Sequence, residues 1–508
     1  MDAVPHATRP PLPPALAAAL VFAASGAVLV LEVVGLRLVG PYLGITLQTS
    51  SAVIATALAA IAYGAWTGGW LADRIDPRRL LAPTLLLAAG ATALTLPLVR
   101  WAGELLRGAA VAGVLLLAGV AIFVPAALLA AVTPLVVKLQ LGDVGHTGRV
   151  VGRLSSIGTL GAITATLGTG FILVAALPTS IVLLGLAGAL AAGGVALAVY
   201  LARLGVGGAS SGLLGRPRAM LAVVGLAGAG LTALAPNPCT VETAYHCARV
   251  VADPARPSGR LLVLNSARHS YVDLADPAHL EFAYTQWIGA FLDGYAPAGR
   301  PLTVLHVGGG GFTLPGYLAA TRPGTVSRVL ELDGDLVALD RARLGLRTGP
   351  RLQVRIGDAR IGVAGEVSGR YDVVIGDAFG HLVVPWHLTT REFIAEIRRV
   401  LRPDGVYALN VIDYPPDRFA RAEVATVAAV FPYVALVAPP DGLAGHRGAN
   451  FVLFASMAPL RLDDLAIRLS ALAEPPGLVS GAELAAFAAG AGVLTDDYAP
   501  VDQMLTGP

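Results

Sequence analysis

The sequence predicts two parts of different fold class. The first is an all-α polytopic membrane domain of about seven helices, and the second is an α/β domain of Rossmann-like type with a small antiparallel β-subdomain in front of it. The chain has 508 residues, of which 55% are hydrophobic and 14% charged, and its mean hydropathy is +0.69. These values lie outside the range of soluble globular proteins. Between residues 302 and 379, four apolar segments each end on glycine or acidic residues, as the strands of a nucleotide-binding sheet do.

The composition divides the chain into four expected segments. They are a disordered, proline-rich tail at 1–14, a transmembrane helical domain at 15–236, the β-subdomain with a linking helix at 237–300, and the Rossmann-like domain at 301–508. Residues 1–236 carry 6 acidic and 13 basic residues, whereas residues 237–508 carry 28 and 23. An acidic soluble part argues against nucleic acid as a partner, because nucleic-acid binding usually needs a basic surface. The first half is expected to have the lipid bilayer as its partner.

Seven apolar stretches are long enough to cross a bilayer. They lie near 15–40, 50–72, 80–99, 108–138, 154–176, 179–202 and 219–236. No small-residue cleavage site follows the first stretch, which is therefore expected to be an anchor. Basic residues gather after the second, fourth and sixth stretches, so the amino terminus is expected to be cytoplasmic. With seven spans the α/β domain then lies on the extracytoplasmic side of the cell membrane, and one miscounted span reverses this.

Two cysteines follow the last apolar stretch, Cys239 and Cys247. An extracytoplasmic compartment allows them to form a disulfide, whereas the cytoplasm would keep two thiols. The absence of any other cysteine in the chain favours the bridge. A disulfide would agree with the orientation that the basic residues predict.

The second half predicts a layered α/β order. Residues 242–252 and 260–274 alternate apolar and polar side chains, which predicts small antiparallel strands. Helices are expected at 276–295 and 387–405. Strands are expected at 302–311, 326–333, 351–359, 371–379, 405–413 and 450–456, in a sheet of seven.

The ends of these strands carry the candidate site. Gly308, Gly309 and Gly310 allow the backbone to approach a ligand where a side chain would collide. Glu331 and Asp358 follow the next two strands, where carboxylates can accept hydrogen bonds from a nucleoside. For each acid alone, a solvated carboxylate at a strand end is the alternative. Several acids at adjacent strand ends favour a nucleoside-binding site over separate solvated carboxylates. The only lysine in the chain is Lys138, which argues against Schiff-base chemistry and a P-loop.

A set of motifs in this order resembles the polyamine aminopropyltransferase (spermidine synthase) family over residues 240–505. They are GGGG at 308–311, LELD at 330–333, GDA at 357–359, YDVVIGDAF at 371–379, VPWHLTTREF at 384–393 and TDDYAP at 495–500. Together with the apolar first half, they resemble more narrowly the bacterial membrane proteins called fused transporter–spermidine synthases. The resemblance implies a fold of the type used by S-adenosylmethionine-dependent transferases.

The resemblance also implies roles for these residues. The donor substrate would be decarboxylated S-adenosylmethionine or S-adenosylmethionine, with no metal. Glu331 would bind the ribose with support from Asp333, and Asp358 with Ala359 would recognise the adenine. Asp377 opens a motif whose carboxylates bind and deprotonate the attacking amine. A homodimer is left open.

The acceptor side departs from the family pattern. Gly380 stands where a second aspartate is expected, and Gly311 where an amine-binding aspartate is expected. A cationic diamine held by fewer carboxylates should bind poorly, because charge-assisted hydrogen bonds carry that recognition. Histidines at 269, 381 and 387 are additional polar groups near the same cleft. The catalytic candidates are Asp377, His269 and His381, and the substrate-side candidates are Tyr284, Gln286, His387, Asp496, Asp497 and Tyr498.

The sequence therefore predicts a membrane-anchored transferase that moves an aminopropyl or related group to an amine or another nucleophile. The acceptor is expected to be an amine or an envelope molecule rather than a simple diamine. One alternative is methyl transfer from S-adenosylmethionine, since both reactions displace at carbon attached to sulfonium. Another is a transporter or sensor without turnover, in which Glu32 and Arg37 inside the first apolar stretch would face a cavity or a partner. The alternative for Glu32 and Arg37 is that they lie near the end of a helix, where their charged groups can reach the membrane surface.

Overall fold

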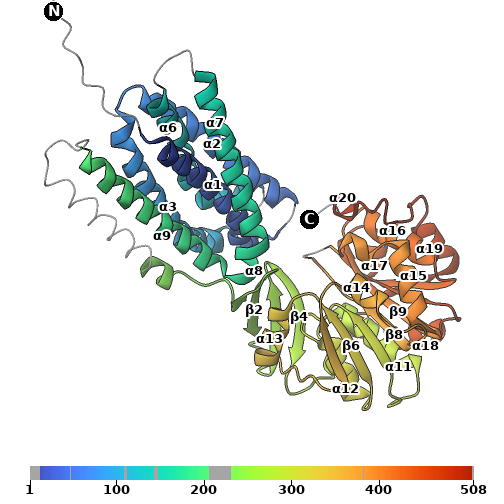
Figure 1. Ribbon diagram of the computed structural model, residues 1–508. Coiled ribbons are helices and arrows are strands. Elements are labelled where there is room, and N and C mark those ends of the chain that lie inside the picture. Colours follow the sequence, from blue (N-terminus) through green and yellow to red (C-terminus); the bar gives the residue numbers. More distant parts are fainter. Residues whose placement is uncertain are drawn as a thin grey trace, which may run out of the picture. The chain divides into compact units, whose positions relative to one another are not determined.

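A computed structural model describes residues 12–45, 47–107, 111–141, 147–204, 230–380 and 383–505. It forms two compact units, Met1–Cys247 and Ala248–Pro508, which are described separately (Figure 1). Residues 1–11 of the expected tail, residues 219–229 of the expected seventh span and the catalytic candidate His381 lie outside the described residues.

The first unit is all-helical up to residue 203, as expected. In the part of the chain that the structure describes, six helices are long and apolar enough to cross a membrane. Two of them contain a π-helical turn, at Gly119–Phe123 and Thr169–Leu173. The elements are α1 (Pro14–Leu43), α2 (Leu47–Ala72), α3 (Pro77–Leu105), α4 (Val111–Ala118), α5 (Val124–Ala130), α6 (Val132–Gln140), α7 (Thr147–Gly168), α8 (Val174–Ala176) and α9 (Thr179–Arg203).

Small residues let these helices pack closely. A Cβ at Gly64 of α2 would lie 2.1 Å from the carbonyl oxygen of Ala127 in α5. A Cβ at Gly161 of α7 would lie 2.3 Å from the carbonyl oxygen of Phe22 in α1. Such contacts replace the hydrophobic driving force that is missing between helices in lipid.

A disulfide between Cys239 and Cys247 closes a short loop after the helices. The guanidinium of Arg37 in α1 donates to the carbonyl oxygens of Thr243 and Ala244 in this loop, at 2.6 Å for Ala244. Glu242 accepts a hydrogen bond of 2.6 Å from the backbone N–H of Thr179 at the start of α9. Arg37 is therefore bound to main-chain carbonyls of the disulfide loop, near the end of its helix.

The second unit is built on an eight-stranded sheet in the order β12-β10-β11-β9-β8-β5-β6-β7. Strands β7, β6, β5, β8 and β9 run parallel, and β11, β10 and β12 add antiparallel pairs. The expected number of seven was wrong by one, and β12 is a four-residue edge strand. The strands are β5 (Thr303–Val307), β6 (Val326–Glu331), β7 (Leu352–Ile356), β8 (Tyr371–Gly376), β9 (Leu401–Asp413), β10 (Tyr433–Ala438), β11 (Ala449–Ser456) and β12 (Gly477–Ser480).

A separate four-stranded antiparallel sheet precedes it, in the order β1-β2-β3-β4. The expected strand at 242–252 is divided by a turn, and the expected helix at 276–295 begins only at Ala283. The elements are β1 (Val241–Glu242), β2 (Cys247–Ala252), β3 (Gly259–Leu264), β4 (Ala267–Asp273) and α11 (Ala283–Tyr295).

Helices cover both faces of the large sheet (Figure 1). On one face, α14, α15 and α16 pack on Leu305, Val374 and Leu409. On the other, α11, α12 and α18 pack on Val304, Val373 and Phe454. The helices are α12 (Thr313–Thr321), α13 (Gly334–Arg343), α14 (Ala359–Ala364), α15 (Arg391–Val400), α16 (Arg418–Ala428), α17 (Pro440–Leu443), α18 (Leu462–Ser470), α19 (Gly481–Phe487) and α20 (Val501–Met504).

Helix α15 is shorter than the helix expected at 387–405. Thr390 caps its start by accepting from the backbone N–H of Phe393 at 3.3 Å, and Leu401 already pairs with Tyr371 of β8. Residues 386–388 form a separate 3-10 turn, η4 (Trp386–Leu388). The shorter helix leaves the segment before it free to lie at the carboxyl ends of the strands.

Arg322 holds the connection between α11 and β5. Its guanidinium is 2% exposed and donates to the carbonyl oxygens of Leu292, Asp293, Ala296, Pro297 and Arg300. Since buried carbonyls without donors are costly, this side chain fixes the end of the helix that carries Tyr284.

Arg322→Ala should lower the free energy of unfolding of the second unit by about 3 kcal/mol, because several buried carbonyls lose a charged donor at once. Chemical denaturation of the purified protein in detergent measures this loss. Arg300→Ala is the matched control, because the side chain of Arg300 is exposed. Equal stability of the two variants would contradict the assignment.

Candidate functional site

The site lies at the carboxyl ends of β5, β6, β7 and β8. Strands β6 and β7 continue the sheet on one side of β5, and β8 and β9 continue it on the other, so the strand order reverses between β5 and β8. Ligands of open parallel sheets bind at such a switch point.

The glycine turn after β5 is held in a conformation that favours glycine. Gly308 has φ +94° and Gly310 φ +50°. A Cβ at Gly308 would lie 2.5 Å from the carbonyl oxygen of Asp377, so no larger residue fits between β5 and β8. The turn therefore brings its own backbone next to the end of β8.

Glu331 at the end of β6 organises this turn. Its Oε2 accepts from the backbone N–H of Gly309 at 2.7 Å and of Gly310 at 3.3 Å, and its Oε1 accepts from Asp333 N–H at 2.9 Å. Burial raises the pKa of Glu331, and these three hydrogen bonds oppose the rise. Asp333 caps α13 by accepting from the backbone N–H groups of Asp335 and Leu336. Asp333 thus supports the site by fixing the turn that follows Glu331.

Asp340 is a further acid beside Glu331 that the sequence analysis missed. It is fully buried in α13, and neither carboxylate oxygen has a hydrogen-bond partner among the described residues. Burial, with the charges of Glu331 and Asp333, raises the pKa of Asp340 to about 8. The signal was available, because Asp340 falls at helical spacing from the buried Leu336 and Val337.

Asp358 follows β7 and uses its two oxygens differently. Oδ1 caps α14 by accepting from the backbone N–H groups of Arg360 at 2.8 Å and Ile361 at 3.4 Å. Oδ2 lies 3.1 Å from Nε2 of His387, which η4 presents. Ala359 is buried beside it in the first turn of α14. The structure therefore brings Asp358 and His387 together.

Asp377 follows β8 at the centre of the site. Its Oδ2 accepts from the hydroxyl of Tyr284 at 3.0 Å and its Oδ1 from Nδ2 of Asn410 at 2.9 Å. Asn450 in turn donates to Oδ1 of Asn410 at 3.0 Å, which orients the Asn410 amide. Burial raises the pKa of Asp377 to about 6, and the hydrogen bonds from Asn410 and Tyr284 oppose the rise. A carboxylate with this pKa can accept a proton near neutral pH.

Asn410 and Asn450 were not among the sequence candidates. They lie on the neighbouring strands β9 and β11, where Asn410 pairs with Val452 and Asn450 with Ile412. An asparagine inside an otherwise apolar strand such as GVYALNVID was the signal, because a buried amide needs a partner.

His269 lies over the glycine turn. A Cβ at Gly310 would be 3.2 Å from its Nδ1, and its ring packs edge-on to Phe379 with centroids 6.5 Å apart. The neighbouring Ser270 accepts from Gly311 N–H at 3.0 Å, and a Cβ at Gly311 would lie 2.9 Å from its Cβ. Ser270 therefore fills the space that an aspartate at position 311 would enter.

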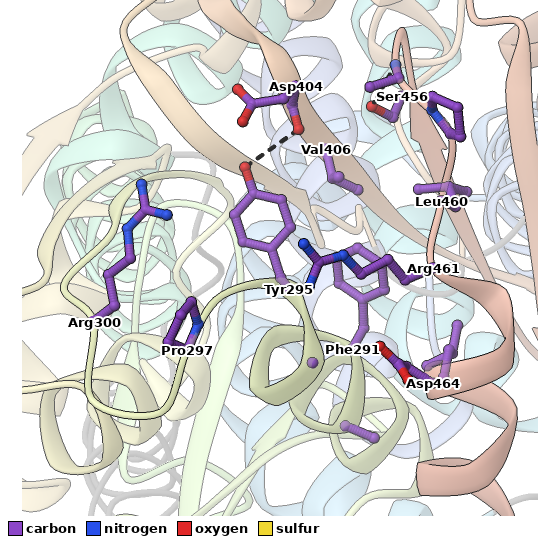
Figure 2. A pocket seen from close by; sticks show the side chains of 15 residues that line it. Phe291, Tyr295, Pro297, Arg300, Asp404, Val406, Ser456, Leu460, Arg461 and Asp464 are labelled. Carbon is purple, nitrogen blue, oxygen red and sulfur yellow. Dashed lines mark hydrogen bonds between the residues drawn. The ribbon is translucent and has the colours of Figure 1, made fainter.

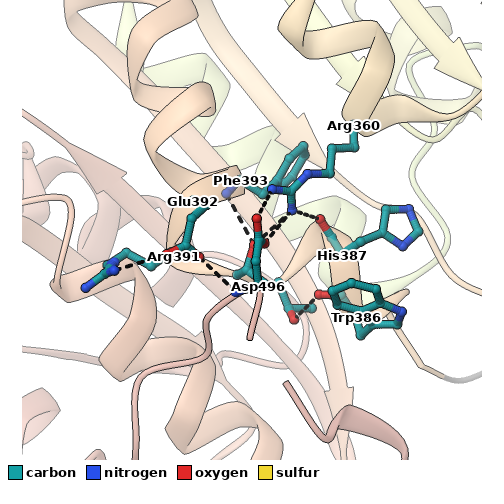
Figure 3. Close-up of polar contacts among 9 residues, drawn as sticks. Arg360, Trp386, His387, Arg391, Glu392, Phe393 and Asp496 are labelled. Atoms are coloured by element: carbon teal, nitrogen blue, oxygen red, sulfur yellow. Dashed lines mark hydrogen bonds and ion pairs between the residues drawn. The ribbon is translucent and has the colours of Figure 1, made fainter. Parts of the chain in front are cut away.

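The remaining substrate-side candidates have other surroundings. Gln286 donates to the carbonyl oxygen of Leu280 at 2.8 Å, at the start of its own helix. Asp496 binds Arg360 and Thr390, as Figure 3 shows. Asp497 and Tyr498 are exposed. In the described part of the chain, no group of three His, Cys, Asp or Glu side chains could hold a metal ion.

A cavity of about 220 Å³ lies at the opposite edge of the sheet, where the parallel strands begin (Figure 2). It is lined by Phe291 and Tyr295 of α11, Asp404 and Val406 of β9, and residues such as Arg461 before α18. None of the sequence-predicted site residues lines it.

Asn410→Leu should raise the pKa of Asp377 above its present value of about 6, because the hydrogen bond that stabilises the charged form is lost. If ionised Asp377 is the base, activity rises with pH through its pKa. The acid limb of the kcat/KM profile should therefore move up by about one pH unit. Asn450→Leu should move it less, since Asn450 acts only through Asn410. An unchanged limb in Asn410→Leu would contradict the role of this hydrogen bond.

The chain is similar over part of its length to proteins of known activity or structure, although no family profile matches it. It is 30% identical over 134 residues to a polyamine aminopropyltransferase of Vibrio vulnificus, covering 26% of this chain and 44% of that protein. It is 27% identical over 123 residues to the human eEF1A lysine and N-terminal methyltransferase, covering 22% and 18%. The chain thus spans less than half the length of either curated relative.

A solved structure matches over a larger share. A probable spermidine synthase from Corynebacterium glutamicum is 30% identical, with a TM-score of 0.47. The match covers 52% of this chain and 96% of that one.

Proposed function

The chain belongs to the spermidine synthase-like family, and we propose that it is a membrane-anchored transferase that moves an aminopropyl or related group from an adenosyl sulfonium donor to an amine. The observation that carries this proposal is Asp377, a half-buried carboxylate beside the glycine turn that accepts hydrogen bonds from Tyr284 and Asn410. Its backbone carbonyl lies next to Gly308, so a donor on the turn and an amine at Asp377 would be neighbours.

The nucleoside half of the donor would bind across the strand ends. The backbone of Gly308–Gly310 allows close approach. Glu331 can accept from a ribose hydroxyl with the lone pair that remains on Oε1, and Asp358 can accept from the 6-amino group of adenine. Decarboxylated S-adenosylmethionine fits aminopropyl transfer, and S-adenosylmethionine itself fits methyl transfer.

Transfer would proceed by displacement at the carbon attached to sulfur. Asp377 takes a proton from the ammonium group of the acceptor, and the freed nitrogen lone pair attacks that carbon. The new C–N bond forms as the C–S bond breaks, and its electron pair neutralises the sulfonium to a thioether. Tyr284 and Asn410 hold the carboxylate in one orientation. This orientation would lower the entropy cost of bringing the amine to the donor.

The acceptor would carry little positive charge beyond the reacting amine. Gly380 and Gly311 leave Asp377 without the two further carboxylates that the family pattern has, and Ser270 fills the space at Gly311. A diamine would leave its second ammonium group without a carboxylate, which costs affinity. An amine with an uncharged remainder, such as an envelope molecule, is the favoured class.

Asp377→Asn should reduce transfer by at least about a hundredfold while nucleoside binding is retained, because the amide cannot accept the proton but keeps the shape. The assay uses the full chain in detergent with each donor and a panel of monoamines and diamines, and mass spectrometry of the products. Methylthioadenosine as product indicates aminopropyl transfer, and S-adenosylhomocysteine indicates methyl transfer. Asp463→Asn is the control, since Asp463 is an exposed acid in the first turn of α18, outside the candidate site. An undiminished rate in Asp377→Asn would contradict the mechanism.

Methyl transfer is the second candidate because one relative is a methyltransferase. A sensor without turnover is the third. It would bind nucleoside with the same residues but release neither product in this assay.

The proposed location is the cell membrane, with several spans and the α/β part on the extracytoplasmic side. The six apolar helices support the membrane, and the Cys239–Cys247 disulfide supports an oxidising compartment. This orientation requires an odd number of spans.

An impermeant maleimide should label Cys239 and Cys247 on intact cells after treatment with an impermeant reductant. Without the reductant no label should appear, because the two thiols are joined. A Cys239→Ser/Cys247→Ser chain controls for other targets. Labelling only after lysis would contradict the proposed orientation and place the domain in the compartment that supplies adenosyl sulfonium compounds.

A further inference from the structure

Arg360 contacts three separate segments of the chain, close to Asp358, the residue proposed to bind the adenine (Figure 3). From the first turn of α14, its Nη1 donates to the carbonyl oxygen of His387 at 2.7 Å and to Oγ1 of Thr390 at 3.0 Å. Both Nη atoms bind the carboxylate of Asp496, at 2.8 and 2.5 Å. We call Arg360, Thr390 and Asp496 the arginine clamp.

Two further hydrogen bonds hold Asp496 in the arginine clamp. Thr390 donates to Oδ1 of Asp496 at 2.7 Å, and the backbone N–H of Asp496 donates to Glu392 at 3.0 Å. Burial acts to raise the pKa of Asp496, but the hydrogen bonds from Thr390 and Arg360 outweigh it and lower the pKa. The carboxylate therefore stays charged, and a planar guanidinium matches it with two parallel bonds.

The position of His387 depends on this clamp. Arg360 holds the His387 carbonyl directly, and through Thr390 it holds the end of the same segment. The imidazole of His387 then lies 3.1 Å from Oδ2 of Asp358. Since Oδ1 of Asp358 already caps α14, His387 fixes the second oxygen, which is the one left to meet a ligand.

We infer that Arg360 is a positioning residue for base recognition, which acts through His387 to aim Asp358 at the 6-amino group of a purine nucleoside. This inference rests on the proposed function. A carboxylate oxygen has two lone pairs, so Oδ2 can accept from His387 and from the amino group together. The clamp fixes the orientation of the Asp358 carboxylate before the ligand binds. Such preorganisation increases affinity, because less conformational entropy is lost on binding.

The arginine clamp makes a prediction that a surface ion pair does not. Ion pairs at the surface contribute little to stability, and a role in folding would affect every ligand alike. A role through Asp358 affects only nucleosides that carry the 6-amino group, because only these donate to Oδ2. Two nucleosides that differ in this one group therefore separate the two roles.

The test measures dissociation constants of the full chain in detergent by calorimetry. The probes are 5′-methylthioadenosine and the same nucleoside with hydrogen in place of the 6-amino group. Wild type should prefer the amino form by about tenfold, as one charge-assisted hydrogen bond provides. Arg360→Ala and His387→Ala should each lose most of this preference, with binding of the deamino form unchanged. The double variant should lose no more than either single variant, because both act on Asp358.

Two further variants sharpen the result. Arg391→Ala is the matched control, because Arg391 is a nearby exposed arginine whose ion pair in the described structure is with its neighbour Glu392, at 3.0 Å. It should retain the full preference. Arg360→Lys keeps the charge but lacks the planar fork, so its preference should be intermediate.

The possible failures are distinguishable. A preference that is unchanged in Arg360→Ala, or an equal loss of affinity for both nucleosides, overturns the inference. Wild type that binds both nucleosides equally also overturns it but leaves the proposed function standing. Wild type that binds neither nucleoside overturns both.

Discussion

The close approach of β5 and β8 is the constraint on which the site depends. Gly308 has no side chain, so its backbone lies against the carbonyl of Asp377, and the turn that could receive a donor adjoins the acid that could receive a proton. Glu331 then binds the N–H groups of Gly309 and Gly310 and keeps the turn in place. In the proposed reaction, donor binding and proton transfer would therefore share one junction of the sheet.

Buried carboxylates around this junction are supported to different degrees. Asp377 has two donors, Tyr284 and Asn410, and its pKa stays in the range where a base can work near neutral pH. Asp340 has no donor in the part of the chain that the structure describes, and burial raises its pKa to about 8, so it is held mainly as the neutral acid. The difference shows that burial alone favours a protonated acid, and that placed donors are what make one available as a base.

The chain departs from the family pattern at the positions where the family binds the acceptor. Glu331 and Asp358, the acids proposed to bind the nucleoside, are present, whereas Gly311 and Gly380 stand where the family pattern has acids. The structure adds a reason at one of these positions, since Ser270 occupies the space at Gly311. A change of acceptor, rather than a loss of the donor site, is the simplest account of this pattern, because polyamine recognition needs several carboxylates and donor recognition does not.

The sequence by itself determined the fold class, the first six long apolar helices and the strand ends that carry Gly308, Glu331, Asp358 and Asp377. These follow from local signals, namely apolar length, strand period and residues that end strands. It misplaced the helix start at Arg391 and missed one edge strand, because caps and edge pairing depend on neighbours. Only the tertiary structure decided which side chains meet. Asn410 on Asp377, His387 on Asp358 and Arg360 on Asp496 join residues 29 to 136 positions apart. No local pattern encodes such contacts, since they arise when the sheet brings distant strand ends to one edge.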